Sequence, residues 1–253
     1  MKFIYFVGTA GSGKSTMVQA YKEWLDHNGI DSIIINLDPG ADMLPYNADI
    51  DIREWIDLAD VMEEYALGPN GAQIVSADLM AVNMKELLAA LDTFKTQFVL
   101  VDTPGQLELF AFRSSSQVIT EALGKHRSMV AFLMDPLLCR SPNGFVSSMM
   151  LSSLVQFRLR LPMMNILSKM DVLKEDEMSR ITSWFDDPEI LYDDLVANSD
   201  DPQNIVGTEL VRALENIGVF GDIRPVSAYE SLGMEEIYGA SQQAFEGGED
   251  ADR

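Results

Sequence analysis

One glycine-rich octapeptide near the N-terminus has the residue types and spacing needed to bind a chain of phosphates. Gly8-Thr9-Ala10-Gly11-Ser12-Gly13-Lys14-Ser15 matches the pattern G-x-x-x-x-G-K-[ST] at every fixed position, between an apolar run and a helical pattern. Glycines let successive backbone N–H groups point at one anion, and the N-terminus of the following helix adds a favourable dipole. The residues expected to bind nucleotide phosphates are Gly8, Gly11, Ser12, Gly13, Lys14, Ser15 and Thr16.

A phosphate site of this kind works with Mg²⁺, and the sequence offers ligands for the ion. We expect Lys14 to bind the β- and γ-phosphates and the Ser15 hydroxyl to ligate Mg²⁺. A second carboxylate on the metal side is expected where another hydrophobic strand ends, and Asp102 follows the apolar run 98–101. Asp102 is therefore predicted to hold Mg²⁺ through water.

Three residues are candidates for the chemistry at the γ-phosphate. The Gly105 N–H is expected to sense the γ-phosphate, and Gln106 is expected to orient the attacking water. Asp38 ends the second apolar run, and ligands of open α/β sheets lie at the C-terminal ends of strands. Its carboxylate is expected either to accept a proton from the water or to belong to the metal shell, although an aspartate before a proline is often a simple turn residue.

Two short motifs late in the chain are typical of guanine recognition. Ser168-Lys169-Met170-Asp171 follows the fifth apolar run, where an Asn/Thr-Lys-x-Asp motif reads guanine by accepting hydrogen bonds from the base on its aspartate. Adenine lacks that pair of donors, so Asp171 would discriminate against it. The stem of Lys169 can cover a face of the base, whereas Ser168 departs from the usual residue. Ser227-Ala228 follows the last run, where a backbone N–H is expected on the guanine oxygen.

These residues lie at the ends of short apolar runs that alternate with longer amphipathic stretches. Runs that are apolar on both faces and separated by helices predict a three-layer α/β fold, with a mainly parallel sheet flanked by helices. The predicted strands are Phe3–Val7, Ser32–Leu37, Gln97–Val101, Ser128–Met134, Met163–Leu167 and Ile223–Val226. The predicted helices are Lys14–Asn28, Ala77–Phe94, Asn143–Leu161, Asn204–Ile217 and Gly233–Phe245.

Two longer segments interrupt this alternation within what we expect to be a single domain over 1–245. The segment 39–71 carries three prolines and the turn-forming Gly68-Pro69-Asn70-Gly71, and connections of this length are often functional. The segment 174–219 holds acidic helical pieces broken at prolines and is predicted to be a helical insertion or lid after the guanine motif. The acidic, glycine-rich residues 246–253 are expected to form a flexible tail.

The composition argues against several classes of function. The net charge is −22, with 40 acidic and 18 basic residues and no basic cluster, so we expect no nucleic-acid partner. No apolar stretch approaches the roughly 18 residues that cross a bilayer, so we expect no membrane partner. A single cysteine, Cys139, fits a reducing compartment and a cytoplasmic location. The acidity is typical of a solvated surface, and adaptation to a salt-rich cytoplasm is a second hypothesis.

With Gly68-Pro69-Asn70 between Asp38 and Asp102, the sequence resembles the GPN-loop GTPases over nearly its whole length. The motifs that carry this resemblance stand in the family's order: Gly8–Ser15, Asp38, Gly68–Asn70, Asp102–Gln106, Ser168–Asp171 and Ser227-Ala228. Since we expect no appended tail domain, we expect the resemblance to be greatest to the short archaeal-type members. The resemblance implies Mg²⁺-dependent hydrolysis of GTP to GDP and phosphate.

The resemblance further implies a homodimer that acts as a nucleotide-dependent switch or assembly factor. In this family the Gly-Pro-Asn loop of one subunit, within about 39–75 here, enters the active site of the other. Asn70 would there contact the γ-phosphate region and help to place the water. Asp38 and Gln106 fall on family positions linked to that water, and Glu108 lies close by. Eukaryotic relatives are implicated in RNA polymerase assembly or transport, whereas the client of this chain stays open.

Other functions are compatible with parts of the pattern. A P-loop ATPase of the partition or metal-chaperone type also dimerises over its nucleotide, but it usually carries an extra lysine where this chain has Thr9 and Ala10. A small-molecule kinase would need an arginine-rich lid. A nucleotide-gated scaffold with slow hydrolysis is compatible with GTPase chemistry. At the γ-phosphate, an asparagine and N–H groups supplied across a dimer could replace an arginine finger, with Arg113 as a rival.

Overall fold

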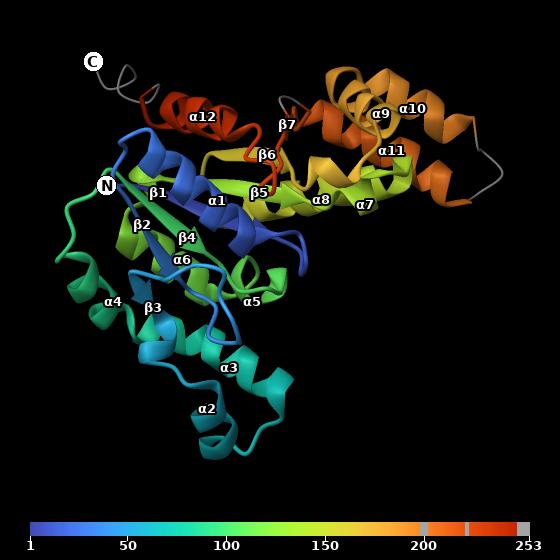
Figure 1. Ribbon diagram of the computed structural model, residues 1–253. Coiled ribbons are helices and arrows are strands. Elements are labelled where there is room, and N and C mark those ends of the chain that lie inside the picture. The colour runs from blue at the N-terminus through green and yellow to red at the C-terminus, as the bar shows by residue number, and fades with distance from the viewer. Residues whose placement is uncertain (198–201, 221–222, 247–253) are drawn as a thin grey trace.

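The computed structural model describes residues 1–197, 202–220 and 223–246, and its framework is one sheet in the order β3-β2-β4-β1-β5-β6-β7 (Figure 1). Every neighbouring pair of these strands is parallel. The strands are β1 Lys2–Gly8, β2 Ser32–Asn36, β3 Ile50–Asp51, β4 Phe98–Asp102, β5 Ser128–Met134, β6 Met163–Leu167 and β7 Ile223–Pro225. The predicted α/β class and parallel sheet are confirmed, and β3 is an additional edge strand.

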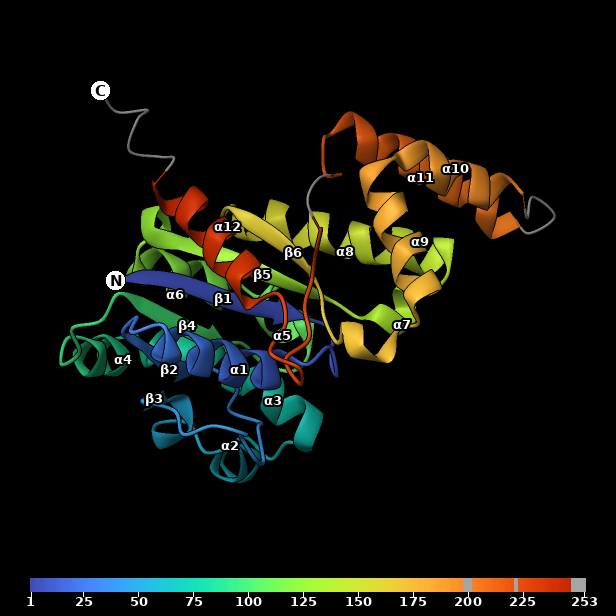
Figure 2. The ribbon, with the colours of Figure 1, turned by 45° about the horizontal axis from the view of Figure 1, so that its top comes forward.

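Successive residues of β1 point to opposite faces of the sheet, and both faces are covered by helices. Ile4 and Phe6 belong to one buried cluster, which also takes in α1 and α12, while Phe3 and Tyr5 belong to a second cluster on the other face. Figure 2 shows α1 and α12 on the near side of the sheet, with α6 and α8 behind it. The molecule therefore has three layers, helix, sheet and helix, as the two-sided apolar runs predict.

The helices follow the predicted pattern at both ends of the chain and differ from it in the middle. The α-helices are α1 Lys14–His27, α2 Leu58–Glu64, α3 Pro69–Val82, α4 Met84–Leu91, α5 Leu107–Phe110, α6 Ser114–Leu123, α7 Pro136–Cys139, α8 Pro142–Leu159, α9 Glu175–Asp186, α10 Pro188–Val196, α11 Pro202–Asn216 and α12 Met234–Glu246. Short 3-10 helices span Ile52–Glu54, Lys125–Arg127 and Met170–Val172. Across the described ranges, none of these helices combines the length and apolar character needed to span a bilayer.

The segment expected to form a turn at Gly68-Pro69-Asn70-Gly71 is the start of α3 instead. Gly68 is the N-cap in an extended conformation and Pro69 is the first helical residue, a position where its fixed φ fits and its missing N–H costs nothing. The turn prediction was therefore wrong. The single helix predicted over Ala77–Phe94 was also wrong, because α3 and α4 meet at Asn83.

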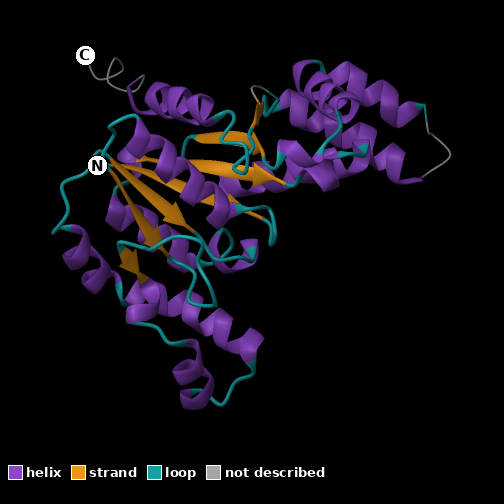
Figure 3. Cartoon of the chain, viewed as in Figure 1, coloured by secondary structure: helices purple, strands orange, loops and turns teal. Residues whose placement is uncertain are grey.

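Three helices, α9, α10 and α11, lie between β6 and β7 in the segment predicted to be an insertion (Figure 3). Their apolar side chains join the cluster that covers the sheet on the α8 side. Phe145 of α8 contacts Trp184 and Phe185 of α9, with ring centroids 5.5 and 5.4 Å apart. The tail predicted over 246–253 lies outside the described residues after Glu246.

Candidate active site

The loop between β1 and α1 is shaped by glycines at three positions. Gly11 and Gly13 have φ angles of 77° and 92°, which residues with a side chain rarely adopt. A Cβ at Gly8 would lie 2.7 Å from both the Leu133 carbonyl oxygen and the Ser12 hydroxyl. The close approach of the loop to β5 therefore requires glycine at the end of β1, as the motif predicts.

Lys14 lies inside this loop and holds two segments together. Its side chain is buried, and Nζ donates to the carbonyl oxygens of Gly8 and Thr9 at 3.0 Å each and of Gly105 at 3.1 Å. Burial lowers the pKa of Lys14 from its usual value, and nearby carboxylates act against that shift. An ammonium group fixed between the glycine loop and the loop after β4 is well placed for a phosphate chain.

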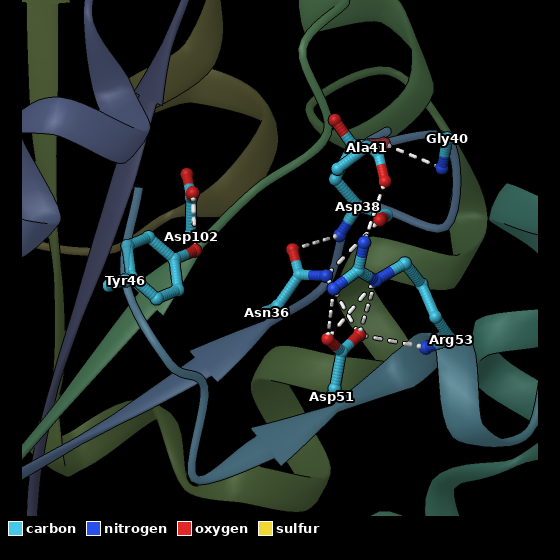
Figure 4. A network of polar contacts seen from close by, with 8 residues as sticks. All are labelled: Asn36, Asp38, Gly40, Ala41, Tyr46, Asp51, Arg53 and Asp102. Atoms are coloured by element: carbon cyan, nitrogen blue, oxygen red, sulfur yellow. Dashed lines mark hydrogen bonds and ion pairs between the residues drawn. The ribbon is translucent and has the colours of Figure 1, made fainter. Parts of the chain in front are cut away.

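Asp102, the last residue of β4, has a buried carboxylate whose two oxygens differ. Oδ2 accepts a 2.6 Å hydrogen bond from the Tyr46 hydroxyl, whereas Oδ1 has no hydrogen-bond partner (Figure 4). Burial raises the pKa of Asp102, while Tyr46, Ser15 and Lys14 act to lower it. A buried carboxylate oxygen without a partner is costly unless a cation or a polar ligand meets it.

The residues at this point of the site fit Mg²⁺. This ion is usually bound by one or two carboxylates together with waters and substrate phosphates, rather than by a cage of protein ligands. The unpartnered Oδ1 of Asp102 lies at the end of the strand next to the glycine loop, and Ser15 is the second residue of α1. Asp102 and Ser15 are therefore the residues that would hold the ion.

Asp38 follows β2 and connects it to the loop after β4. Its Oδ2 accepts the Gly105 N–H at 2.8 Å and its Oδ1 accepts the Gly40 N–H at 2.9 Å. Because Lys14 binds the Gly105 carbonyl, both backbone polar groups of Gly105 are engaged. The N–H group predicted to sense the γ-phosphate is thus bonded to Asp38 in this conformation.

A polar network behind Asp38 fixes its backbone (Figure 4). Asn36 is fully buried, accepts the Asp38 N–H at 3.0 Å and donates to Asp51 at 2.9 Å. Arg53 binds Asp51 through Nε at 3.0 Å and Nη2 at 2.6 Å, and it donates to the Ala41 carbonyl at 2.7 Å. The sequence reasoning missed this network, for which the only signal was a polar residue at the end of an apolar run.

Ser168 connects the end of β6 to the glycine loop. It is fully buried, and its hydroxyl lies 2.8 Å from the Ser12 carbonyl oxygen and 2.9 Å from that of Met134. Although Ser168 departs from the usual Asn or Thr at this position, its side chain therefore still bridges the glycine loop and the end of β5.

The other residues predicted to read the base meet beside the glycine loop. Lys169 Nζ donates to the Gly11 carbonyl at 2.5 Å, so the lysine stem lies along the loop. The Ser227 hydroxyl donates to Asp171 Oδ1 at 2.6 Å, which joins the ends of β6 and β7, and Ala228 follows directly. Asp171 is exposed, with a carboxylate available to a ligand on the solvent side.

Two predicted catalytic side chains lie outside these contacts. Gln106 is exposed just before α5, and Asn70 is exposed in the first turn of α3. Among the described residues, neither side chain forms a hydrogen bond with the glycine loop. Arg113, considered as a source of positive charge at the γ-phosphate, is paired with Asp78 of α3.

A parallel sheet with a glycine loop after its central strand, a buried lysine in that loop and an aspartate at the end of the adjacent strand define the P-loop nucleotide-binding class. The family model described as "Conserved hypothetical ATP binding protein" matches residues 6–247. The chain belongs to the family of GPN-loop GTPases, as the curated relatives that it matches show.

Two relatives and one solved structure illustrate the similarity. GPN-loop GTPase 1 of Saccharomyces cerevisiae is 36% identical over 176 residues, 68% of this chain and 46% of the relative. GPN-loop GTPase PAB0955 of Pyrococcus abyssi is 34% identical over 190 residues, 73% of this chain and 75% of the relative. The crystal structure of PAB0955, a GTPase in apo form, superposes with a TM-score of 0.85 at 29% identity, covering 96% of this chain and 97% of that one. The chain spans about half the length of the first curated relatives, 46%, 59% and 54%.

Proposed function

We propose that this protein hydrolyses GTP to GDP and phosphate with Mg²⁺. The observation that carries the proposal is the direct link between the base motif and the phosphate loop, the 2.5 Å hydrogen bond from Lys169 to Gly11. Asp171, from the same motif as Lys169, accepts a 2.6 Å hydrogen bond from the Ser227 hydroxyl. A purine between these residues would have its phosphates on the glycine loop and its Watson–Crick edge toward a carboxylate.

The phosphate chain has a set of donors ready in the loop. The backbone N–H groups of Gly13, Lys14 and Ser15 and the dipole of α1 favour an anion, whereas the Ser12 N–H is bonded to the Thr9 carbonyl at 3.1 Å; the Lys14 ammonium exchanges its carbonyl partners for phosphate oxygens. Mg²⁺, when bound by Ser15 and through water by Asp102, neutralises charge on the β- and γ-phosphates. The residues of the glycine loop position the phosphates and keep other charged groups out of the site.

The γ-phosphate competes with Asp38 for one donor. The Gly105 N–H that Asp38 accepts at 2.8 Å is a donor that the γ-phosphate would take over. Asp38 is then released to accept a proton from the attacking water. Gln106, the residue after Gly105, orients that water. This exchange makes the loop after β4 respond to the presence of the γ-phosphate, as a nucleotide-dependent switch requires.

The matching family model is described as ATP binding, whereas the relatives are described as GTPases. The choice of guanine over adenine therefore needs a test, and Asp171 is the residue at which to make it. In Asp171→Asn the carboxylate becomes an amide, which presents a donor to the base and pairs with xanthine better than with guanine. Affinity for GDP should fall by about tenfold or more and affinity for XDP should rise, since one unpaired polar group costs about 1–3 kcal/mol. Titration of GDP, XDP and ADP by calorimetry measures this change. Unaltered preference, or tight binding of ADP by the wild type, would contradict the guanine site.

The remaining parts of the proposal concern the assembled protein. A homodimer in which Asn70 of each subunit serves the other's site is supported by membership of the GPN-loop family, and Asn70 is exposed in the first turn of α3. The corresponding cellular role is to assist the assembly of a client protein in the cytoplasm. A scaffold that hydrolyses GTP slowly is compatible with the same site.

A further inference from the structure

Tyr46 is the residue beside the nucleotide site that neither the motifs nor the proposed reaction accounts for. Its hydroxyl donates to Asp102 Oδ2 at 2.6 Å, across 56 positions of sequence (Figure 4). A carboxylate oxygen can only accept a hydrogen bond, and a tyrosine hydroxyl is protonated near neutral pH, so the phenol is the donor. This hydrogen bond to a charged, buried acceptor is of the strong kind.

The ring of Tyr46 is held in place by the core. It is half-buried and packs against the cluster on the α1 face of the sheet. Leu44, Pro45 and Tyr46 line a hollow with Ile34 of β2 and Gln19 of α1, so this stretch of chain lies over the first helix. The hydroxyl therefore reaches Asp102 from an anchored ring, in the otherwise irregular segment 39–49.

The two oxygens of Asp102 thus have separate environments. Oδ2 is fixed by Tyr46, and Oδ1 is buried without a partner. Outer-shell hydrogen bonds of this kind hold metal-binding carboxylates in one orientation, and their loss typically weakens metal binding by about 10–100-fold. Without the hydroxyl, Oδ2 loses its hydrogen-bond partner, and this contact no longer opposes rotation of the Asp102 side chain.

We propose that Tyr46 is a positioning residue for the metal side of the site, which holds Asp102 with one oxygen left for the Mg²⁺ shell and ties the segment 39–49 to the bound ion. The inference rests on the proposed function, because it takes Asp102 to be the carboxylate on the metal side. It also explains why a segment without regular structure has an aromatic residue anchored in the core.

The test measures metal affinity directly, with Mn²⁺ in place of Mg²⁺. Mn²⁺ is titrated into full-length protein carrying a non-hydrolysable GTP analogue, and free Mn²⁺ is counted from its paramagnetic resonance signal. Tyr46→Phe should bind Mn²⁺ about tenfold more weakly, while its affinity for the nucleotide in EDTA stays at the wild-type level. Tyr192→Phe, which removes a hydroxyl that accepts a hydrogen bond from Arg212 at 2.9 Å in the helices between β6 and β7, is the matched control and should leave both affinities unchanged.

Asp102→Asn separates failure of this inference from failure of the proposed function. If Asp102→Asn weakens Mn²⁺ binding and Tyr46→Phe binds as tightly as the wild type or more tightly, Tyr46 has no positioning role. If Asp102→Asn has no effect, the metal assignment itself is wrong and the inference falls with it. A measurement on the wild type avoids dependence on folding of a variant. Hydrogen exchange of segment 39–49 in the nucleotide complex should slow when Mg²⁺ is added, and equal exchange would overturn the inference.

Discussion

Gly105 is the residue at which the parts of the site meet. Asp38 accepts its N–H at 2.8 Å and Lys14 donates to its carbonyl at 3.1 Å. In the proposed function a triphosphate uses both Lys14 and the Gly105 N–H, so its binding would break these contacts and form new ones. On this proposal Gly105 would respond to the state of the nucleotide, with Asp38 as the partner that the γ-phosphate would displace.

Asp38→Asn tests the role of this carboxylate. The amide oxygen can still accept the Gly105 N–H, so the loop after β4 should keep its position, while the amide nitrogen cannot accept the Gly40 N–H and the side chain loses its charge and its basicity. Single-turnover hydrolysis of GTP should slow by about 100-fold, the usual contribution of a general base. Affinity for GDP, measured by calorimetry, should not change. Hydrolysis at the wild-type rate would remove Asp38 from the chemistry.

The positions of most candidate binding residues at the strand ends were predictable from sequence, because each follows a run that is apolar on both faces. Asp102 follows β4's buried run and Ser168 follows β6, and both lie where predicted. Tyr46 and Arg53 could not be predicted, since their function depends on partners brought together only by the fold. No local pattern of types or spacing marks a tyrosine that will meet an aspartate 56 positions away.

At the scale of elements, α3 connects the Gly-Pro-Asn tripeptide to the site. Asn70 is in its first turn, and Gln73, one turn on, lies against the turn that holds Asp38. A Cβ at Gly40 would be 3.1 Å from Gln73 Nε2. A movement of α3 would therefore shift Gln73 against the turn that contains Asp38 and Gly40. The tripeptide was mistaken for a turn because proline, asparagine and glycine favour turns as well as helix starts.

Asn70→Ala tests the contribution of α3 to turnover. The helix should persist, since Pro69 and Gly68 still form its start, and GDP affinity should remain at the wild-type level. GTP turnover should fall by about 100-fold or more if the amide is a fixed donor at the reacting phosphate, as removal of one such donor does elsewhere. Full activity would exclude Asn70 from the reaction.

A mixture of Asn70→Ala and Lys14→Ala protomers shows whether the amide acts across a dimer. Each mixed dimer has one site with an intact Lys14 and a partner that has Asn70, so activity should exceed that of either variant alone. No recovery of activity on mixing, with mixed dimers demonstrated by mass, would contradict action in trans.

The edge strand β3 and the helix α6 were missed for a simple reason. β3 has two residues, Ile50 and Asp51, too few to form a recognisable apolar run. The α6 sequence begins with three serines, which are weak helix formers and common in loops. Elements that are short or poor in apolar residues depend on tertiary packing, and sequence periodicity does not reveal them.

For the whole molecule, the three-layer fold brings the C-terminal ends of β1, β2, β4, β6 and β7 to one side of the sheet, and the predicted binding residues other than Asn70 lie at or after these strand ends. The net charge of −22 opposes the approach of a nucleotide, because the surface of an acidic protein repels anions at long range. Binding of a nucleotide by such a molecule requires local positive charge strong enough to overcome that field. Lys14, Mg²⁺ and backbone N–H groups are the sources that we assign.

Calorimetric titration of GTP into the folded protein with Mg²⁺ tests this central claim most directly. We predict one site per chain, and an affinity at least about tenfold weaker in Lys14→Ala, since a hydrogen bond to a charged group contributes about 1.5–3 kcal/mol. Circular dichroism confirms that both samples are folded. If the wild type gives no heat with either GTP or ATP, or Lys14→Ala binds GTP as tightly as the wild type, the loop Gly8–Ser15 is not a phosphate site and the account is wrong.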